Sequence, residues 1–132
     1  MRDPLANQEV VAAVMRRHGR FLLAQRPAHK PKGGLWEFPG GKVEPAESLE
    51  AAIARELCEE LSLQPAARPR RLLTLSEGHL QLHFMAVRAT GTPDKRVHQA
   101  IAWCSLQQAR RLPLCPLDRQ FLNTLLARQL SG

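Results

Sequence analysis

The sequence is poor in cysteine, and none of its three cysteines has a partner at the short spacing that zinc sites use. Cys58, Cys104 and Cys115 are also too few and too scattered for the disulfide framework of a small secreted domain. We therefore interpret all three as ordinary buried or half-buried small residues.

Long hydrophobic runs are absent as well. The chain contains no uninterrupted apolar window of about 18 residues, the length that a membrane-spanning helix needs. Residues 1–4 lack the apolar core of a secretion signal. We expect no membrane association and a cytoplasmic location.

Tyrosine is missing and aromatic residues make up 5% of the chain, which disfavours a surface that stacks bases along a nucleic-acid strand. The formal net charge of +7 attracts phosphates of any kind, from small substrates to polyanions. The basic residues are dispersed, without the run of like charge that marks a disordered arm. A solvated basic surface is therefore favoured over stable binding of a nucleic-acid polymer.

What is present predicts one α/β domain over residues 1–132, since the length suits a single core. Two apolar runs around Gly19 predict a hairpin, and residues 26–41 are too rich in proline and glycine for a helix. Further patterns predict helices over about 46–61 and after Pro116, and strands at 71–76, 80–88 and 101–104. The fold class that follows is a mixed sheet flanked by helices.

The helix predicted over residues 46–61 carries carboxylates on its apolar side. At about 100° per residue, Glu56 and Glu60 lie within about 40° of each other, and Glu59 lies about 60° further round. Such carboxylates repel one another and lose solvation near the core. The helix is either an acidic surface helix or part of a cation site. A bound divalent cation would compensate both the repulsion and the loss of solvation.

Two neighbouring features favour the cation. Arg55 lies one turn before Glu59, where it can orient a carboxylate through a charged hydrogen bond. Gly40 and Gly41 allow the backbone to turn sharply and approach closely just before the helix. A backbone carbonyl of that turn can then point at the same ion.

The spacing of these residues resembles the Nudix box. Gly41 is followed by five residues, Glu47, seven residues, and then the run 55–63, which reads RELCEELSL. The family usually has glycine where this chain has Ser62, a position at the end of the helix. A match over so many positions is far more specific than a lone glycine motif.

The resemblance covers nearly the whole chain and points to the MutT-like branch. It is carried by residues 23–27, 34–44, Trp103, 112–114 and 116–118. The family implies an α/β/α sandwich that hydrolyses nucleoside triphosphates to monophosphate and pyrophosphate.

The same resemblance implies a role for each residue of the box. A Mg²⁺ or Mn²⁺ ion would be held by the Gly40 carbonyl, Glu56, Glu59 and Glu60. Glu56 would also activate water, Arg55 would orient the glutamates, and Glu47 would assist. Cations neutralise phosphate oxygens while a positioned carboxylate helps bound water attack phosphorus.

For the base, the resemblance points to Arg26, Phe38 and Asp118. Phe38 is either a packing surface for the base or a core residue, and Asp118 is either a contact to the base edge or a helix N-cap. Many relatives supply a further glutamate shortly before the last strand, where this chain reads RVHQ at 96–99. We interpret His98 there as a surface residue, since magnesium prefers oxygen ligands.

The leading hypothesis is an 8-oxo-dGTP diphosphatase that cleanses the nucleotide pool, as a monomer or weak dimer. A CTP or modified dCTP pyrophosphohydrolase is nearly as well supported, because oxidised-guanine enzymes usually have Asn where this chain has Asp118. A non-catalytic nucleotide-sensing domain usually lacks some of the box glutamates, all of which are present here. A basic nucleic-acid-binding module is the remaining alternative.

Overall fold

The computed structural model describes residues 7–131, without the side chains of residues 130 and 131, so the N-terminal residues 1–4 lie outside the description. Its elements are β1 (Gln8–Arg17), β2 (Arg20–Gln25), β3 (Trp36–Glu37), β4 (Gly40–Lys42), α1 (Leu49–Leu61), β5 (Arg70–Glu77), β6 (Leu80–Val87), β7 (Ala100–Cys104), α2 (Leu106–Arg110) and α3 (Pro116–Ser131). The predicted hairpin, the later strands and the terminal helix are all present.

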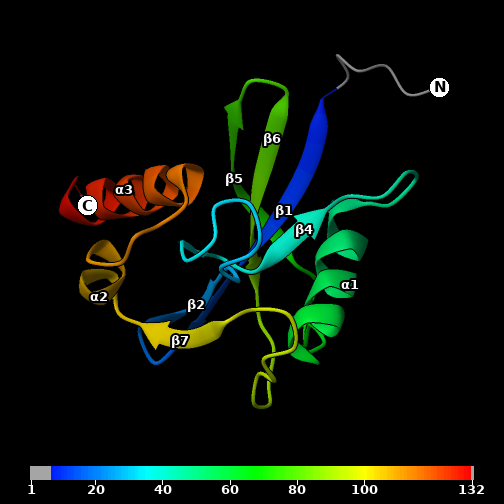
Figure 1. Cartoon of the computed structure of the whole chain (residues 1–132), viewed down its shortest axis with the longest axis horizontal. Helices are drawn as coiled ribbons and strands as arrows, with labels where there is room; N and C mark the ends of the chain where they lie inside the picture. Colours follow the sequence, from blue (N-terminus) through cyan, green and yellow to red (C-terminus); the bar gives the residue numbers. More distant parts are fainter. Residues whose placement is uncertain (1–6, 132) are drawn as a thin grey trace.

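Strand β1 is the centre of the sheet. It pairs in parallel with β6 and antiparallel with β2 and β4. The strand order of the sheet is β3-β2-β1-β6-β5, and β7 pairs antiparallel with β2. Helix α1 covers one side of the strands, and α2 and α3 lie on the other (Figure 1). This arrangement confirms the expected mixed sheet between helices.

Both faces of β1 are buried, which explains its continuous apolar run. Val11, Ala13 and Met15 join the cluster beneath α1, whereas Ala12 and Val14 face the cluster that includes α3. The strand thereby anchors the two helical layers, and it carries β4 along its edge at the point where the functional site lies.

Helix α1 begins later than expected. The predicted start near Ala46 is wrong, because Ala46 has a φ of 65°, outside the helical region. Ser48 is the N-cap, and its hydroxyl accepts a hydrogen bond from the backbone N–H of Ala51 at 3.0 Å. The helix ends at Ser62, whose φ of 56° is left-handed.

Three short elements were not predicted, and the first of them, β3, pairs with the end of β2. Strand β4 forms because its backbone pairs with residues 10–12 of β1. This is a tertiary contact, which a local glycine-rich sequence does not predict. Helix α2 begins with a capping box, in which Ser105 accepts from the Gln108 backbone and the Gln108 side chain accepts from the Ser105 backbone. That box is a sequence signal which could have revealed the helix.

Cys104 and Cys115 are buried as expected, but Cys58 is exposed on the outer face of α1, so that part of the interpretation is wrong. Within residues 7–131, no helix combines the length and apolar character that crossing a membrane requires.

Candidate active site

The site begins where α1 packs on β4. The Glu56 carboxylate lies directly over Gly41, so that a Cβ at this position would collide with it. A Cβ at Gly40 would collide with the Val11 backbone of β1. Gly40 therefore lets β4 approach β1 as no larger residue would, and a side chain at Gly41 would force the Glu56 carboxylate to move.

Arg55 organises the carboxylates around it. Its Nε and one terminal nitrogen donate to both oxygens of Glu47, at 2.8 and 2.9 Å, and the other terminal nitrogen donates to Glu56 at 2.9 Å and Glu59 at 3.3 Å. The Arg55 hydrogen bond, with help from the Glu44 backbone, lowers the pKa of Glu47 to about 2. The expected contact between Arg55 and Glu59 is present.

Glu60 lies deeper than any other carboxylate of α1, with 7% of the residue exposed. Burial raises the pKa of its carboxyl to about 9, and the neighbouring charges of Glu56 and Glu37 contribute to the increase. Its Oε2 is buried and has no hydrogen-bond partner among the described residues. Two adjacent carboxyls, one of them with an unsatisfied oxygen, fit a hard divalent cation.

Glu59 does not lie with the Glu56 and Glu60 carboxyls. Its side chain is 58% exposed and leans toward Arg55. Within residues 7–131, no three His, Cys, Asp or Glu side chains converge closely enough to hold an ion. Magnesium bound together with substrate phosphates needs only one or two carboxylates, which Glu56 and Glu60 can supply. The ligand roles of Glu59 and of the Gly40 carbonyl stay predictions.

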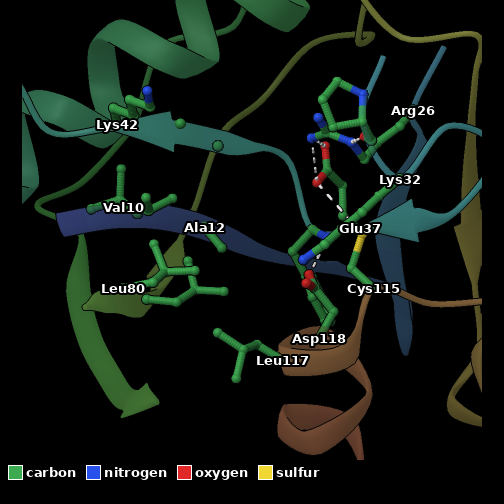
Figure 2. A pocket seen from close by; sticks show the side chains of 16 residues that line it. Val10, Ala12, Arg26, Lys32, Glu37, Lys42, Leu80, Cys115, Leu117 and Asp118 are labelled. Carbon is green, nitrogen blue, oxygen red and sulfur yellow. Dashed lines mark hydrogen bonds and ion pairs between the residues drawn. The ribbon is translucent and has the colours of Figure 1, made fainter. Parts of the chain in front are cut away.

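A pocket of about 330 Å³ opens beside the two glycines. Figure 2 shows Arg26, Lys32, Glu37 and Asp118 on one side of it, and Val10, Leu80 and Leu117 on the other, where Lys42 lies above Val10. A hollow with a broad apolar wall and a few convergent polar groups suits a nucleobase.

Asp118 faces this pocket from the first turn of α3. The helix begins at Pro116, so the interpretation of Asp118 as an N-cap is wrong. Its Oδ1 instead accepts a hydrogen bond from the backbone N–H of Phe38 at 2.8 Å. Burial raises the pKa of Asp118 to about 7, although the Phe38 hydrogen bond opposes that shift.

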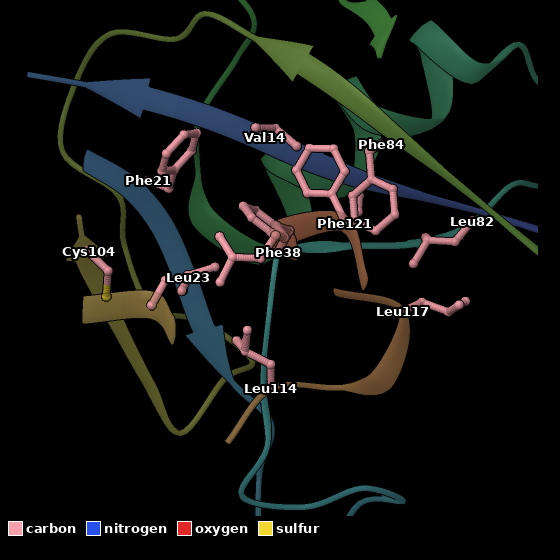
Figure 3. Close-up of a cluster of buried hydrophobic side chains, with 13 residues drawn as sticks. Val14, Phe21, Leu23, Phe38, Leu82, Phe84, Cys104, Leu114, Leu117 and Phe121 are labelled. Carbon is pink, nitrogen blue, oxygen red and sulfur yellow. The ribbon is translucent and has the colours of Figure 1, made fainter. Parts of the chain in front are cut away.

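Phe38 is a core residue with 3% of its surface exposed. Its ring meets Phe21, Phe84 and Phe121 edge to face, at centroid distances of 5.4 to 6.3 Å. Figure 3 shows it among these aromatic side chains. The core alternative therefore describes the ring, while its place in the pocket lining leaves a contribution to base binding as a prediction.

Glu37 is a site residue that sequence reasoning missed. It binds Arg26, with its Oε1 at 3.2 Å from Arg26 Nη1, and it binds His98, with its Oε2 at 3.2 Å from His98 Nε2. The His98 side chain is 5% exposed, so its interpretation as a surface residue is wrong. A carboxylate inside the glycine and proline loop was the available signal, but its partner lies 61 positions away.

The sandwich and its carboxylate-bearing helix define a class of hydrolase that acts on phosphoric anhydrides. The NUDIX domain family matches residues 6–125, and the chain belongs to this family. It is therefore a Nudix hydrolase, and its similarities lie in the MutT-like group.

Three similar proteins illustrate the group. CTP pyrophosphohydrolase of Escherichia coli K12 is 44% identical over 126 residues, covering 90% of this chain and 91% of its own. Putative 8-oxo-dGTP diphosphatase 2 of Mycobacterium tuberculosis is 34% identical and covers 97% and 94% of the two chains. A solved MutT structure, from work on Aliivibrio salmonicida and Vibrio cholerae, is 29% identical, with a TM-score of 0.81 over 92% of this chain and 98% of its own.

Proposed function

We propose that the protein is a metal-dependent pyrophosphohydrolase that converts nucleoside triphosphates to the monophosphate and pyrophosphate. The observation that carries this proposal is the pair of Glu56, packed over Gly41, and the buried Glu60, next to glycines that line a pocket large enough for a nucleobase. A bound Mg²⁺ or Mn²⁺ would neutralise phosphate oxygens and lower the pKa of bound water.

The residues around the pair have distinct tasks in this proposal. Glu56, which Arg55 holds at 2.9 Å, accepts the proton of the attacking water. Glu47 keeps the Arg55 guanidinium in place through two hydrogen bonds. Lys32 and Lys42 line the pocket and attract the polyphosphate.

Two bases fit Asp118. A protonated carboxyl can donate to the N3 acceptor of cytosine, whereas an ionised one can accept from the N4 amino group of cytosine or from the N–H groups of an oxidised guanine. A pKa of about 7 makes both states available near neutral pH. Similarity to the E. coli CTP enzyme favours a cytidine nucleotide, and similarity to the M. tuberculosis protein favours 8-oxo-dGTP.

The reaction is tested by pyrophosphate release with Mg²⁺ on normal, oxidised and methylated nucleoside triphosphates. Glu56→Gln removes the proton acceptor without changing shape, so kcat should fall by roughly 10² to 10⁴. Glu50→Gln is the matched control, since Glu50 lies on the same helix and pairs with the exposed Arg68. Full turnover in both Glu56→Gln and Glu60→Gln would refute the proposal.

The same panel separates the two bases. A CTP or modified dCTP preference predicts the highest kcat/KM for the cytidine nucleotides of the panel, and an 8-oxo-dGTP preference predicts the highest kcat/KM for the oxidised guanine nucleotide. Salt-sensitive retention of a nucleic-acid polymer, without turnover of any nucleotide, would favour the binding-module alternative. The single domain, the oligomeric state and the cytoplasmic location stay predictions.

A further inference from the structure

A line of side chains joins the nucleotide pocket to the deepest carboxyl of the site. It runs from Arg26 to Glu37 at 3.2 Å, from Glu37 to His98 at 3.2 Å, and from His98 Nε2 to Glu60 Oε2 at 3.8 Å. The four residues come, in this order, from the loop after β2, from β3, from the segment before β7 and from α1. They surround a hollow of about 220 Å³ that also reaches Gly40.

His98 is held firmly at the centre of this line. The next residue, Gln99, donates its backbone N–H to the Gln25 carbonyl at 2.9 Å. Two positions earlier, the Arg96 backbone N–H donates to the Glu60 carbonyl at 3.2 Å. The segment is thereby tied to β2 on one side and to the end of α1 on the other, so the imidazole has little freedom to move.

The imidazole has one role that its contacts define. A carboxylate only accepts hydrogen bonds, so Nε2 must carry a proton to bond Glu37. Nε2 lies 3.2 Å from the Glu37 oxygen that accepts this hydrogen bond and 3.8 Å from Glu60 Oε2, which is beyond hydrogen-bond distance. His98 Nδ1 is buried and has no partner among the described residues, so this contact orients the ring.

Glu37 uses both of its oxygens in the line. Its Oε1 accepts from Arg26, whose Nε donates to the Pro31 carbonyl in the loop that borders the pocket. Its Oε2 accepts from His98. A single carboxylate therefore links the Arg26 loop to His98.

We propose that Glu37 and His98 are positioning residues, which place an N–H donor 3.8 Å from the buried Oε2 of Glu60 at the cation site and connect it to the Arg26 side of the nucleotide pocket. This inference rests on the proposed function only for Glu60 as a cation ligand. Groups that orient ligands in this way commonly change metal affinity by about 10- to 100-fold when they are removed.

The first test is Mn²⁺ binding without nucleotide, followed by electron paramagnetic resonance of the free ion. His98→Leu should weaken Mn²⁺ binding by roughly tenfold or more, and His98→Gln, which restores an N–H donor at similar reach, should recover most of the loss. His79→Leu is the matched control, because His79 is exposed in the β5 to β6 turn. Unchanged Mn²⁺ binding in His98→Leu, or equal loss in both His98 variants, would overturn the proposal.

The second test addresses the connection. The test is a double-mutant cycle of Arg26→Leu, His98→Leu and the double variant. The loss of Mn²⁺ binding free energy in the double variant should be smaller than the sum of the losses in the two single variants, because each substitution interrupts the same chain of contacts. Additive changes would contradict the link through Glu37. Should His98→Leu fail to fold by circular dichroism, Glu37→Gln replaces it in both tests, with the same expected loss.

These readouts keep the two proposals apart. If Mn²⁺ binding depends on His98 while no nucleotide is hydrolysed, the proposed function fails and the positioning role stands. If Glu56→Gln abolishes turnover while Mn²⁺ binding is unaffected in His98→Leu, only the positioning role fails.

Discussion

Arg55 shows how much a single side chain can do at the scale of the residue. Its guanidinium donates hydrogen bonds to three glutamates, lies 3.7 Å from a fourth, Glu44, and also donates to the Lys42 carbonyl of β4 at 2.9 Å. The planar fork matches the two oxygens of Glu47, which a lysine ammonium cannot do. The geometry of the carboxylates therefore depends on arginine in particular, beyond its positive charge.

Arg55→Lys should accordingly lower kcat by about 10- to 100-fold, because the glutamates lose their common anchor while the charge is kept. Steady-state pyrophosphate release measures the effect. Arg68→Lys is the control, since the Arg68 side chain is 86% exposed and pairs only loosely, at 3.5 Å, with Glu50. Equal kcat in the two variants would contradict the anchoring role.

The buried carboxyl of Asp118 should make the free energy of unfolding depend on pH. Its pKa in the folded protein is about 7, above its ordinary 3.8, so the folded state binds the proton more tightly than the unfolded chain. This contribution to stability is complete below about pH 4 and is lost as pH rises through about 7, by no more than about 1.4 kcal/mol per unit.

The comparison is with Asp118→Asn, whose amide oxygen can still accept from Phe38. Urea unfolding in the presence of a chelator, between pH 4 and 8, should give a free energy of unfolding for the wild type that falls relative to the variant. Parallel curves for the two proteins would show that the carboxyl is not perturbed by burial.

At the scale of the element, the end of α1 differs from the usual family pattern. Ser62 adopts a left-handed conformation, and the backbone N–H of Leu63 closes the helix on the Leu57 carbonyl at 3.3 Å. Glycine reaches this conformation without strain. Ser62 offsets part of the strain, because its hydroxyl accepts from Arg96 at 2.9 Å.

Ser62→Gly should therefore stabilise the protein by roughly 0.5 to 1 kcal/mol, the difference between relief of left-handed strain and loss of an exposed hydrogen bond. Ser62→Ala is the control, since it loses the hydrogen bond and keeps the strain, and it should be less stable than the wild type. Thermal melts of the three proteins decide between these expectations, which fail if Gly ranks below Ser.

At the scale of the whole molecule, an aromatic cluster ties α3 to the sheet beneath the pocket. Phe84 of β6 and Phe121 of α3 stack in parallel, with centroids 4.2 Å apart, and Phe38 meets both rings edge on. Since Phe38 also donates to Asp118, the core and the polar side of the pocket share one residue.

Phe121→Ala should lower the free energy of unfolding by about 3 to 5 kcal/mol, because it leaves a cavity where a fully buried ring was. Leu125→Ala, at a partly buried position one turn later on the same helix, should cost clearly less. Urea unfolding of both variants measures the difference. Equal losses would mean that the stack does not carry the contact between α3 and the sheet.

Much of the fold was predictable because its signals are local. The apolar runs of the hairpin, the periodic helices and the turn residues lie within short windows of sequence. The start of α1 was misplaced because Pro45 and Glu47 fit a first helical turn, whereas Ser48 provides the actual cap. Strand β4 depends on pairing with β1, which no local pattern reports.

The residues of the candidate site also fall into those that local sequence predicts and those that depend on tertiary contacts. Glu56, Glu59, Glu60 and Arg55 could be found because one helix sets their spacing. The burial of His98 and its contact with Glu37 could not, because those residues are 61 positions apart and meet only when β3 and the segment before β7 pack against β2.

The sequence by itself determined the type of chemistry, because the spacing of the glutamates and Arg55 on one helix follows from 3.6 residues per turn. The tertiary structure alone decided which of these side chains are buried and desolvated. Desolvation depends on neighbours from distant segments, so only the packed sheet and helices bury Glu60, separate Glu59 from it and bring a histidine between two carboxyls.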